Sequence, residues 1–427
     1  MTAAEEIKQP ERPKLLEIMG PGLITGASDD DPSGIATYSQ VGAQFGFGLG
    51  WTLVVTFPLM AAIQEISARI GRVTGYGIAG NLRRHYPAWL LNATVALLLI
   101  ANIINIGADL GAMGAALQLL IGGPHLLYVL GFSIVSVLLE IFVRYSRYVS
   151  VLKYLTLSLL AYVATVFVVN VPWGTVLHQI VLPPFSFDKN HVLAVTAVLG
   201  TTISPYLFFW QAEEEVEEEH ERPEQAPLVE APLQAPRELF RIRYDTVIGM
   251  ALSNLVALAI VVTTAATLNA HGVTNIETSA QAAEALRPIA GPFAFALFAC
   301  GIIGTGLLAM PVLAGSAAYA LGEAAGWRVG LAEKARRAPA FYGAIAVATA
   351  IGLVMNFTPI HPIQALFWSA VINGIVAVPV MAVMMLMTHR RDIMGNFVLP
   401  PVLTGLGWLA TIAMAATVVG LAVASFM

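Results

Sequence analysis

Repeated apolar runs of about 20 residues are the feature that most constrains this chain, because each can cross a hydrocarbon core of roughly 30 Å as a helix. The runs make 57% of the 427 residues hydrophobic, leave 11% charged and give a mean hydropathy of +0.74. Soluble domains carry about 25% charged residues, so a soluble core is excluded. The sequence therefore predicts an all-α polytopic membrane protein that lies in the lipid bilayer.

Eleven apolar segments, bounded by charges or by Pro and Gly clusters, predict about 11 transmembrane helices. Lys and Arg gather in alternate loops: 20 of the 22 fall on the side of the N-terminal tail, and only Lys189 and Arg287 fall on the other. Basic loops are typically cytoplasmic, so we expect a cytoplasmic N-terminus and an extracellular C-terminus in a bacterial plasma membrane. The segments are residues 17–44, 48–70, 88–121, 124–143, 150–171, 191–212, 243–269, 289–324, 339–356, 361–388 and 398–426.

Several function classes are excluded or disfavoured by composition and motifs. The single cysteine, Cys300, excludes a disulfide framework and a cysteine-based metal cluster. A net charge of −5 gives no reason to expect a nucleic-acid partner. HExxH and GxSxG motifs are absent from the sequence, which disfavours a membrane enzyme. We expect no enzymatic activity and no cofactor, and we find no sign of an obligate protein partner.

Two segments differ from plain spans, and both are predicted to be broken helices. The first places Asp29, Asp30 and Asp31 at mid-membrane, where each charge costs roughly 2.5–3.5 kcal/mol unless it faces water or a ligand. The sixth carries the Gly-Thr-Thr-Ile-Ser-Pro run 200–205 at its centre, where proline removes a backbone donor. A simple proline kink is an equal alternative for the sixth segment. It does not explain the aspartates of the first.

The two broken segments lie five helices apart, which predicts a five-plus-five repeat of inverted topology. Paired interrupted helices at equivalent positions are the best sequence pointer to a transporter's midplane binding site. An acidic stretch within the second repeat is interpreted as a flexible linker or, alternatively, as a vestibule that attracts cations. The predicted organisation is a cytoplasmic tail 1–16, a first repeat 17–171, a second repeat 191–388 with the acidic cytoplasmic loop 213–238, and a last helix 398–426.

The first segment, GPGLITGASDDDPSGIATYSQVGAQFG, and the later QEISARIGRVTG resemble the NRAMP family of divalent-metal transporters. That family carries GPG, Asp-Pro-Gly-Asn and GAQFG in its first helix and LSARLG in its second. The Gly-x-Thr-x-x-Pro pattern of the sixth segment is similar to the family's Gly-Ala-Thr-Val-Met-Pro-His. The resemblance implies a LeuT-type inverted-repeat fold with a metal ion bound between the unwound parts of helices 1 and 6.

The family's metal ligands, carried over by position, are only partly kept. The metal-binding aspartate falls on Asp31, but the following asparagine falls on Gly34. The alanine that offers a backbone carbonyl falls on Thr201, and the methionine that offers a sulfur falls on Ser204. This pattern resembles the NRAMP-related magnesium transporters, which lack the soft ligand. The expected metal site is therefore Asp31, Gly34, Thr201 and Ser204, with Asp30 and Asp29 beside them.

The loss of sulfur favours a hard ion on physical grounds. Thioethers favour softer metals, whereas carboxylate, hydroxyl and carbonyl oxygens favour Mg²⁺, Ca²⁺ and Mn²⁺. Two shortened side chains leave room for water, and Mg²⁺ usually keeps several waters while one or two carboxylates hold it. We therefore expect uptake of a partly hydrated divalent cation by alternating access, Mg²⁺ first and Mn²⁺ also.

The expected proton route is also incomplete. The family's helix-6 histidine falls on Tyr206, and of the two helix-3 acids only Asp109 remains. These two residues, with Asn373 of helix 10, are candidates for the cavity lining. Transport without proton coupling is therefore expected. The alternatives are a proton-coupled Mn²⁺ or Fe²⁺ symporter of the NRAMP type and a LeuT-fold carrier of organic solutes.

Overall fold

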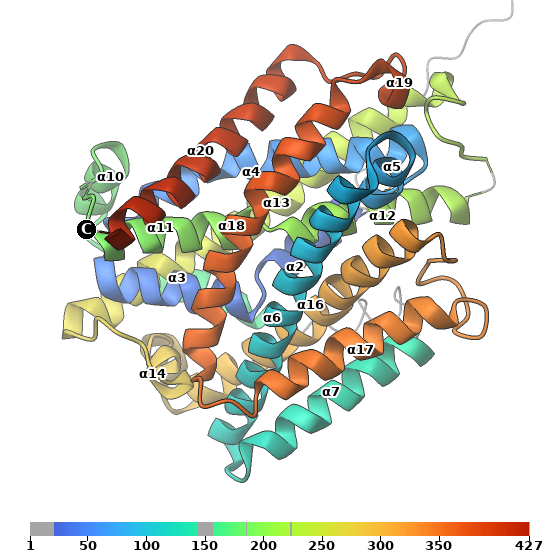
Figure 1. The fold of residues 1–427 in the computed structure, drawn as a ribbon. Helices are drawn as coiled ribbons and strands as arrows, with labels where there is room; N and C mark the ends of the chain where they lie inside the picture. Colours follow the sequence, from blue (N-terminus) through green and yellow to red (C-terminus); the bar gives the residue numbers. More distant parts are fainter. Residues whose placement is uncertain (1–20, 144–156, 185, 223, 427) are drawn as a thin grey trace, which may run out of the picture.

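The computed structural model describes residues 21–143, 157–184, 186–222 and 224–426, and within these ranges the regular structure is entirely helical. The predicted tail 1–16, the first residues of the first span and the basic residues Arg144, Arg147 and Lys153 lie outside the described residues. Figure 1 shows long helices crossing the molecule at several angles, with α20 running along one side to the C-terminus.

Eight helical segments of the described ranges are long and apolar enough to cross a membrane, and one bent pair raises the number to nine. The pair consists of Leu157–Val168 and Trp173–Val181, bent by 111°. The eight are Gly50–Thr74 (α4), Ala88–Ile121 (α6), His125–Phe142 (α7), Lys189–Glu221 (α11 and α12), Pro232–His271 (around α13), Arg287–Ala325 (around α16), Pro362–Thr388 (α18) and Pro401–Phe426 (α20).

The two predicted spans that this criterion leaves out are also helical. The first is the polar pair α2 (Pro21–Asp29) and α3 (Pro32–Phe45), and the ninth is the shorter α17 (Pro339–Met355). The remaining elements are α5 (Ile78–His85), η1 (Leu157–Leu159), α9 (Leu160–Val168), α10 (Trp173–Val181), α11 (Lys189–Thr202), α12 (Pro205–Glu221), η2 (Pro232–Gln234), α13 (Ala235–Thr267), η3 (Asn269–His271), α14 (Ser279–Glu284), α15 (Arg287–Ala290), η4 (Gly291–Phe293), α16 (Ala294–Ala325) and α19 (Arg391–Met394).

Both predicted helix breaks are confirmed. α2 ends at Asp29 and α3 begins at Pro32, while α11 ends at Thr202 and α12 begins at Pro205. Each second half thus starts with proline, which lacks a backbone donor and suits the first helical turn. Asp31 caps α3, since its Oδ1 accepts a 2.7 Å hydrogen bond from the Gly34 N–H.

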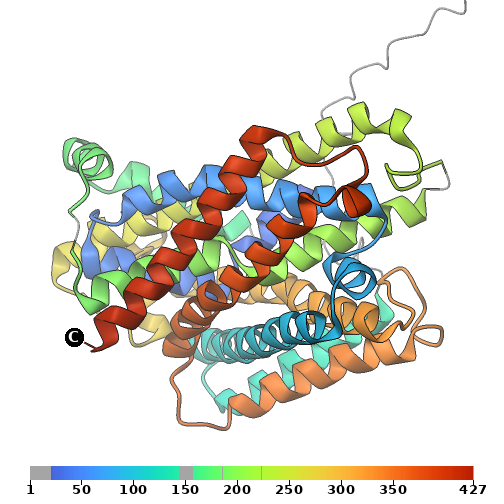
Figure 2. The same ribbon diagram turned by 45° about the horizontal axis from the view of Figure 1, so that its top comes forward.

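Two groups of helices meet at these breaks, while α11, α18 and α20 pack with one another. One group is α6, α7, α16 and α17, which pack against one another on one side of the molecule in both views (Figures 1 and 2). The other is α2, α3, α4, α12 and α13, in which α13 packs against α2, α3 and α4, and α12 packs against α2 and α4. Because α16 contacts α2, α3 and α12 as well, the breaks lie against the first group. This arrangement places the aspartates of the first break inside the protein.

The acidic stretch differs from the expected loop 213–238. α12 continues as a helix to Glu221, and α13 already begins at Ala235. Glu215 and Glu219 are buried rather than solvated. The physical reason is that Arg241 and Arg72 pair with these carboxylates, so the acids can be held against the protein.

Candidate metal site

Asp31 is the residue at which the two broken helices meet. Its carboxylate is 1% exposed. One oxygen, Oδ1, caps α3, while the other, Oδ2, accepts a 3.1 Å hydrogen bond from the Tyr206 hydroxyl of α12. Tyr206, expected to line the cavity, therefore contacts the predicted metal ligand directly. These two donors therefore orient both carboxylate oxygens.

Gly34 of α3 and Thr201 of α11 lie opposite each other at the two breaks. Residues that belong to one metal site must lie close together in this way. A methyl group at Gly34 would lie 3.3 Å from Thr201 Oγ1 and 3.3 Å from the Asp29 carbonyl oxygen. Glycine at this position therefore lets α3 approach α11. Ser204 uses its hydroxyl hydrogen locally, because its Oγ bonds to the carbonyl oxygens of Gly200 at 2.8 Å and Thr201 at 2.9 Å. Its oxygen lone pairs remain the available donors.

Asp29 and Asp30 are buried beside Asp31 but have different surroundings. Asp29 Oδ2 accepts a 2.5 Å hydrogen bond from Ser253 of α13. Asp29 Oδ1 and Asp30 Oδ1 receive no hydrogen bond in the described part of the chain. Ser253 was not predicted, because the seventh span has no polar pattern that distinguishes it from a plain helix. One carboxylate oxygen of each aspartate is therefore left without a partner at the break.

Further unpaired polar atoms lie on the helices α6, α12 and α18. Asp109 of α6 is fully buried, and among the described residues neither of its carboxylate oxygens has a hydrogen-bond partner. The same holds for both amide atoms of Gln211 on α12 and for the amide oxygen of Asn373 on α18. Asp109 and Asn373 were predicted as cavity lining, whereas Gln211 was missed although its amide lies near the end of an apolar span. Buried polar atoms of this kind require partners, which water or an ion can supply.

The aspartates do not form a ready-made cage. Within the described residues, no three His, Cys, Asp or Glu side chains converge closely enough to hold a metal ion together. An ion at Asp31 would therefore take its other ligands from backbone carbonyls, hydroxyls, amides or water. Hard divalent cations accept such ligands.

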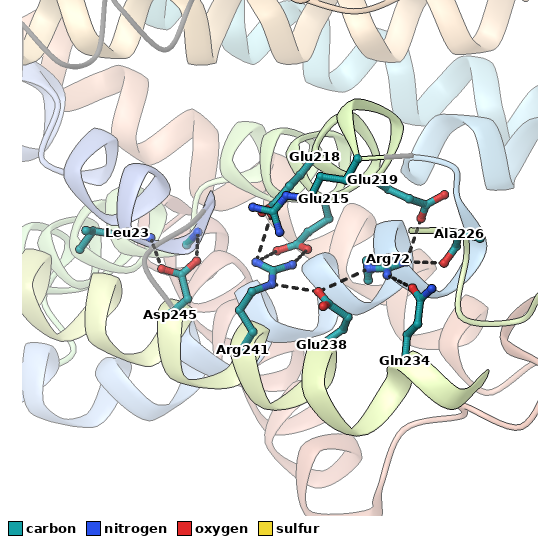
Figure 3. A network of polar contacts seen from close by, with 12 residues as sticks. Leu23, Arg72, Glu215, Glu218, Glu219, Ala226, Gln234, Glu238, Arg241 and Asp245 are labelled. Carbon is teal, nitrogen blue, oxygen red and sulfur yellow. Dashed lines mark hydrogen bonds and ion pairs between the residues drawn. The ribbon is translucent and has the colours of Figure 1, made fainter. Parts of the chain in front are cut away.

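A network of ion pairs connects the ends of α4 and α12 to the beginning of α13 (Figure 3). Arg72 donates to Glu219 at 3.0 Å and to the Ala226 carbonyl oxygen at 2.6 Å. Arg241 pairs with Glu215, with Glu218 at 3.2 Å and with Glu238 at 3.0 Å. Both guanidinium groups are buried, so the network fixes these helices to one another with little screening by solvent.

Asp245 of α13 holds the beginning of α2. Its two carboxylate oxygens accept the backbone N–H groups of Gly22 at 2.6 Å and Leu23 at 3.1 Å (Figure 3). These N–H groups belong to the first helical turn, which has no intrahelical acceptors for them and favours a negative charge. Gly26 and Gly249 let the two backbones touch, since a methyl group at Gly26 would lie 2.4 Å from the Gly249 carbonyl carbon. The half-helix that leads to Asp29 is thus clamped to α13.

Residues 22–424 match the family model described as natural resistance-associated macrophage protein-like. The chain belongs to the Nramp family. Relatives within this family include the divalent metal cation transporter MntH of Yersinia pestis (strain Pestoides F), 28% identical over 315 residues that cover 71% of this chain and 72% of the relative. The protein of the same name from Verminephrobacter eiseniae is 24% identical over 392 residues, covering 90% and 83%. These Nramp relatives are named as transporters, not enzymes.

Solved structures show the same fold. The Eremococcus coleocola manganese transporter, in complex with an aromatic bis-isothiourea substituted compound, aligns with a TM-score of 0.71 and 18% identity, over 94% of this chain and 85% of that one. MhsT in complex with L-phenylalanine aligns with a TM-score of 0.61 and 12% identity, over 97% and 100%. The predicted LeuT-type fold is therefore confirmed for this Nramp chain.

Proposed function

We propose that this Nramp-family chain is an integral membrane transporter of divalent metal ions, with Asp31 as the charged ligand. The observation that carries the proposal is the group of three buried aspartates at the break of the first helix. None of them pairs with a Lys, Arg or His in the described part of the chain. Buried charge without a partner is very costly, and a divalent cation is the partner that would compensate it.

The ligand set proposed for the ion consists of Asp31, Gly34, Thr201 and Ser204, with Asp29 and Asp30 adjusting the local charge. The relatives favour Mn²⁺ over the Mg²⁺ preference expected from the sequence, because the named substrate of a structural neighbour is manganese. We therefore propose that Mn²⁺ is carried. The oxygen-only donor set supports acceptance of Mg²⁺ as well, since no sulfur is present to select softer metals.

Energy coupling is the second open property. A divalent ion that enters a cell gains about 4.6 kcal/mol per 100 mV of inside-negative potential, so the membrane potential alone can drive uptake. The neutral phenol of Tyr206 at the histidine position supports uptake without protons. Proton-coupled symport is the rival proposal, and Asp109 is the residue that would carry it, since its carboxylate is buried and unpaired among the described residues.

We also propose that the N-terminus is cytoplasmic, the C-terminus is extracellular and the membrane is a bacterial plasma membrane. The distribution of Lys and Arg supports this orientation. It places the ion-pair network of Arg72 and Arg241 at the cytoplasmic end. Asp245 and the beginning of α2 lie near this network (Figure 3).

The test of this function is uptake into proteoliposomes of the purified chain, with Mn²⁺, Mg²⁺, Ca²⁺ and an amino-acid mixture offered separately. We expect saturable Mn²⁺ entry that Asp31→Asn abolishes, because asparagine keeps the helix cap but removes the charge. Absence of cation flux under every condition would contradict the proposal. Entry of amino acids instead would support a LeuT-fold carrier of organic solutes.

A further inference from the structure

A second pair of acids lies outside the aspartate break, in a cavity of about 1030 Å³ formed by α5, α12 and α16. Glu213 of α12 and Glu323 of α16 both line this cavity. A methyl group at Gly77 would meet Glu213 Oε1 at 1.7 Å and Glu323 Oε2 at 2.7 Å. The two carboxylates therefore converge on the same side of Gly77, where the absence of a side chain lets both approach.

Glu213 is a buried acid of α12 that forms no ion pair with a Lys, Arg or His in the described part of the chain. Its side chain is 2% exposed. In the described part of the chain, Oε1 receives no hydrogen bond. The other two fully buried glutamates of α12 differ, because Glu215 pairs with Arg241 and Glu219 pairs with Arg72. The unpaired oxygen of Glu213 therefore points to a ligand rather than to a structural ion pair.

Glu323 is fixed in place by the backbone of α5. Its carboxylate oxygens accept the N–H groups of Gly77 at 2.9 Å and Gly80 at 2.7 Å. Arg84 also lines the cavity, but its guanidinium lies over the Tyr76 ring, 3.5 Å from the ring centroid, rather than in an ion pair with Glu323. A carboxylate oriented in this way can serve as a rigid ligand.

Among the described residues, the other charged side chains of the cavity form no ion pair with Glu213 or Glu323. Glu217 is already satisfied by the Tyr319 hydroxyl and by the Ala332 N–H. The N–H of Arg83 donates to the main-chain carbonyl of Glu323 and not to its carboxylate. The remaining charged lining residues are Glu221, Glu333 and Arg337. Two adjacent carboxylates without a cation repel each other, so the pair favours either a bound cation or a shared proton.

We propose that Glu213 and Glu323 bind a second, partly hydrated divalent cation, distinct from the ion at Asp31. Two carboxylates with several retained waters are typical of Mg²⁺ sites, and Mn²⁺ favours the same oxygen ligands. The cavity has room for these waters. The site connects α12, which carries Tyr206 at its other end, to α5 and α16. In the proposed orientation it faces the cytoplasm, so a cation there would couple the internal metal concentration to the position of α12. This last consequence, unlike the binding site itself, rests on the proposed transport function.

The experiment titrates detergent-purified Asp31→Asn with Mn²⁺ and measures free Mn²⁺ by electron paramagnetic resonance. The Asp31→Asn background removes the charged ligand of the transport site, so remaining binding reports the second site. We expect one bound Mn²⁺ per chain, displaced by Mg²⁺. Adding Glu213→Gln or Glu323→Gln should weaken this binding at least tenfold. Glu221→Gln, an exposed residue of the same cavity, is the matched control and should leave it unchanged.

Two results would overturn the proposal: no Mn²⁺ bound to Asp31→Asn at millimolar concentration, or binding that neither glutamine variant weakens. The first would also be the result if the two carboxylates share a proton. Elution as a single monodisperse species verifies the fold of each variant, and the two single substitutions give independent readings. Because binding is read without transport, a failure of this site and a failure of the transport proposal give different results.

Discussion

The Tyr206 hydroxyl donates a 3.1 Å hydrogen bond to Asp31 Oδ2 and thereby joins the break of the first helix to the break of the sixth. Both residues are at most 1% exposed. A side chain that touches the proposed metal ligand at this distance can orient its carboxylate and can respond when an ion binds.

Asp31→Asn is expected to abolish metal uptake while the protein still folds. Asparagine retains an oxygen that can accept the Gly34 N–H, so the helix cap is kept, whereas Asp31→Ala would add a cap loss of about 1 kcal/mol. The measurement is Mn²⁺ uptake into proteoliposomes together with thermal unfolding in detergent. Tyr206→Phe is the companion variant, and we expect it to raise KM by up to about tenfold, equivalent to about 1.4 kcal/mol. Uptake by Asp31→Asn at the wild-type rate would refute the site.

Ion preference is expected to change with Gly34→Asn combined with Ser204→Met. These substitutions supply an amide oxygen and a thioether, which should strip water from the ion and favour Mn²⁺ over Mg²⁺. The measurement is competition of unlabelled Mg²⁺ against radioactive Mn²⁺ uptake. Gly34→Leu with Ser204→Leu is the matched control, because it adds similar bulk at both positions without new ligands. An unchanged ranking in the amide and thioether variant would show that ligand softness does not set the preference.

Metal entry under an imposed membrane potential is expected to proceed without acidification of the proteoliposome interior. The reason is that Tyr206 occupies the position of the family's histidine, and a phenol, unlike an imidazole, does not exchange a proton near neutral pH. The measurement uses a pH-sensitive dye inside the proteoliposomes, and its signal is recorded together with metal uptake. Asp109→Asn is the informative variant. Stoichiometric acidification that Asp109→Asn removes would establish the proton-coupled alternative instead.

Asp245→Ala is expected to release α2 from α13. The substitution removes both acceptors of the Gly22 and Leu23 N–H groups, and each hydrogen bond to a charged group contributes about 1.5–3 kcal/mol. The measurement is thiol labelling of Ser28→Cys, 1% exposed in the native chain, after the single exposed Cys300 is replaced by serine. We expect labelling to accelerate roughly tenfold or more, the factor that about 1.4 kcal/mol of destabilisation gives.

The control for this labelling is Thr349→Cys, which is equally buried but lies on α17 in the other helix group. Its labelling rate should not respond to Asp245→Ala. Equal acceleration at both cysteines would indicate general unfolding, and no acceleration at either would contradict a clamp by Asp245.

Arg241→Gln is expected to destabilise the fold strongly. Its removal leaves Glu215, Glu218 and Glu238 without their shared cation, and breaking a buried ion pair costs about 3–5 kcal/mol. Arg287→Gln is the matched control, since Arg287 pairs with Glu284 at 3.0 Å but is 63% exposed, where such pairs contribute about 0–1 kcal/mol. Thermal unfolding in detergent compares the two. Equal Tm values for the two variants would show that the network does not hold these helices together.

The sequence by itself determined the membrane class, the positions of the helical segments and the two breaks. Each follows from local patterns: apolar length, proline and glycine in mid-span, and three consecutive aspartates. The residues that form such a pattern lie within about one helix of each other. The break around Pro32 could therefore be predicted at the position where it occurs. The same short segment resembles the family's motif, and this resemblance identified Asp31 as the expected metal ligand.

Only the tertiary structure decided which distant residues meet. Tyr206 lies 175 positions from Asp31, Ser253 lies 224 from Asp29 and Glu219 lies 147 from Arg72. A hydropathy pattern carries no information about contacts between residues so far apart in the sequence. The stretch from Glu213 onward was therefore interpreted as a solvated linker. In the folded chain, the buried Arg72 of α4 and Arg241 of α13 pair with Glu219 and Glu215, and this pairing is what makes the burial of these two acids stable. The order of that helix and the pairing of Asp31 are therefore properties of the packed fold, because the compensating charge or donor comes from another part of the chain.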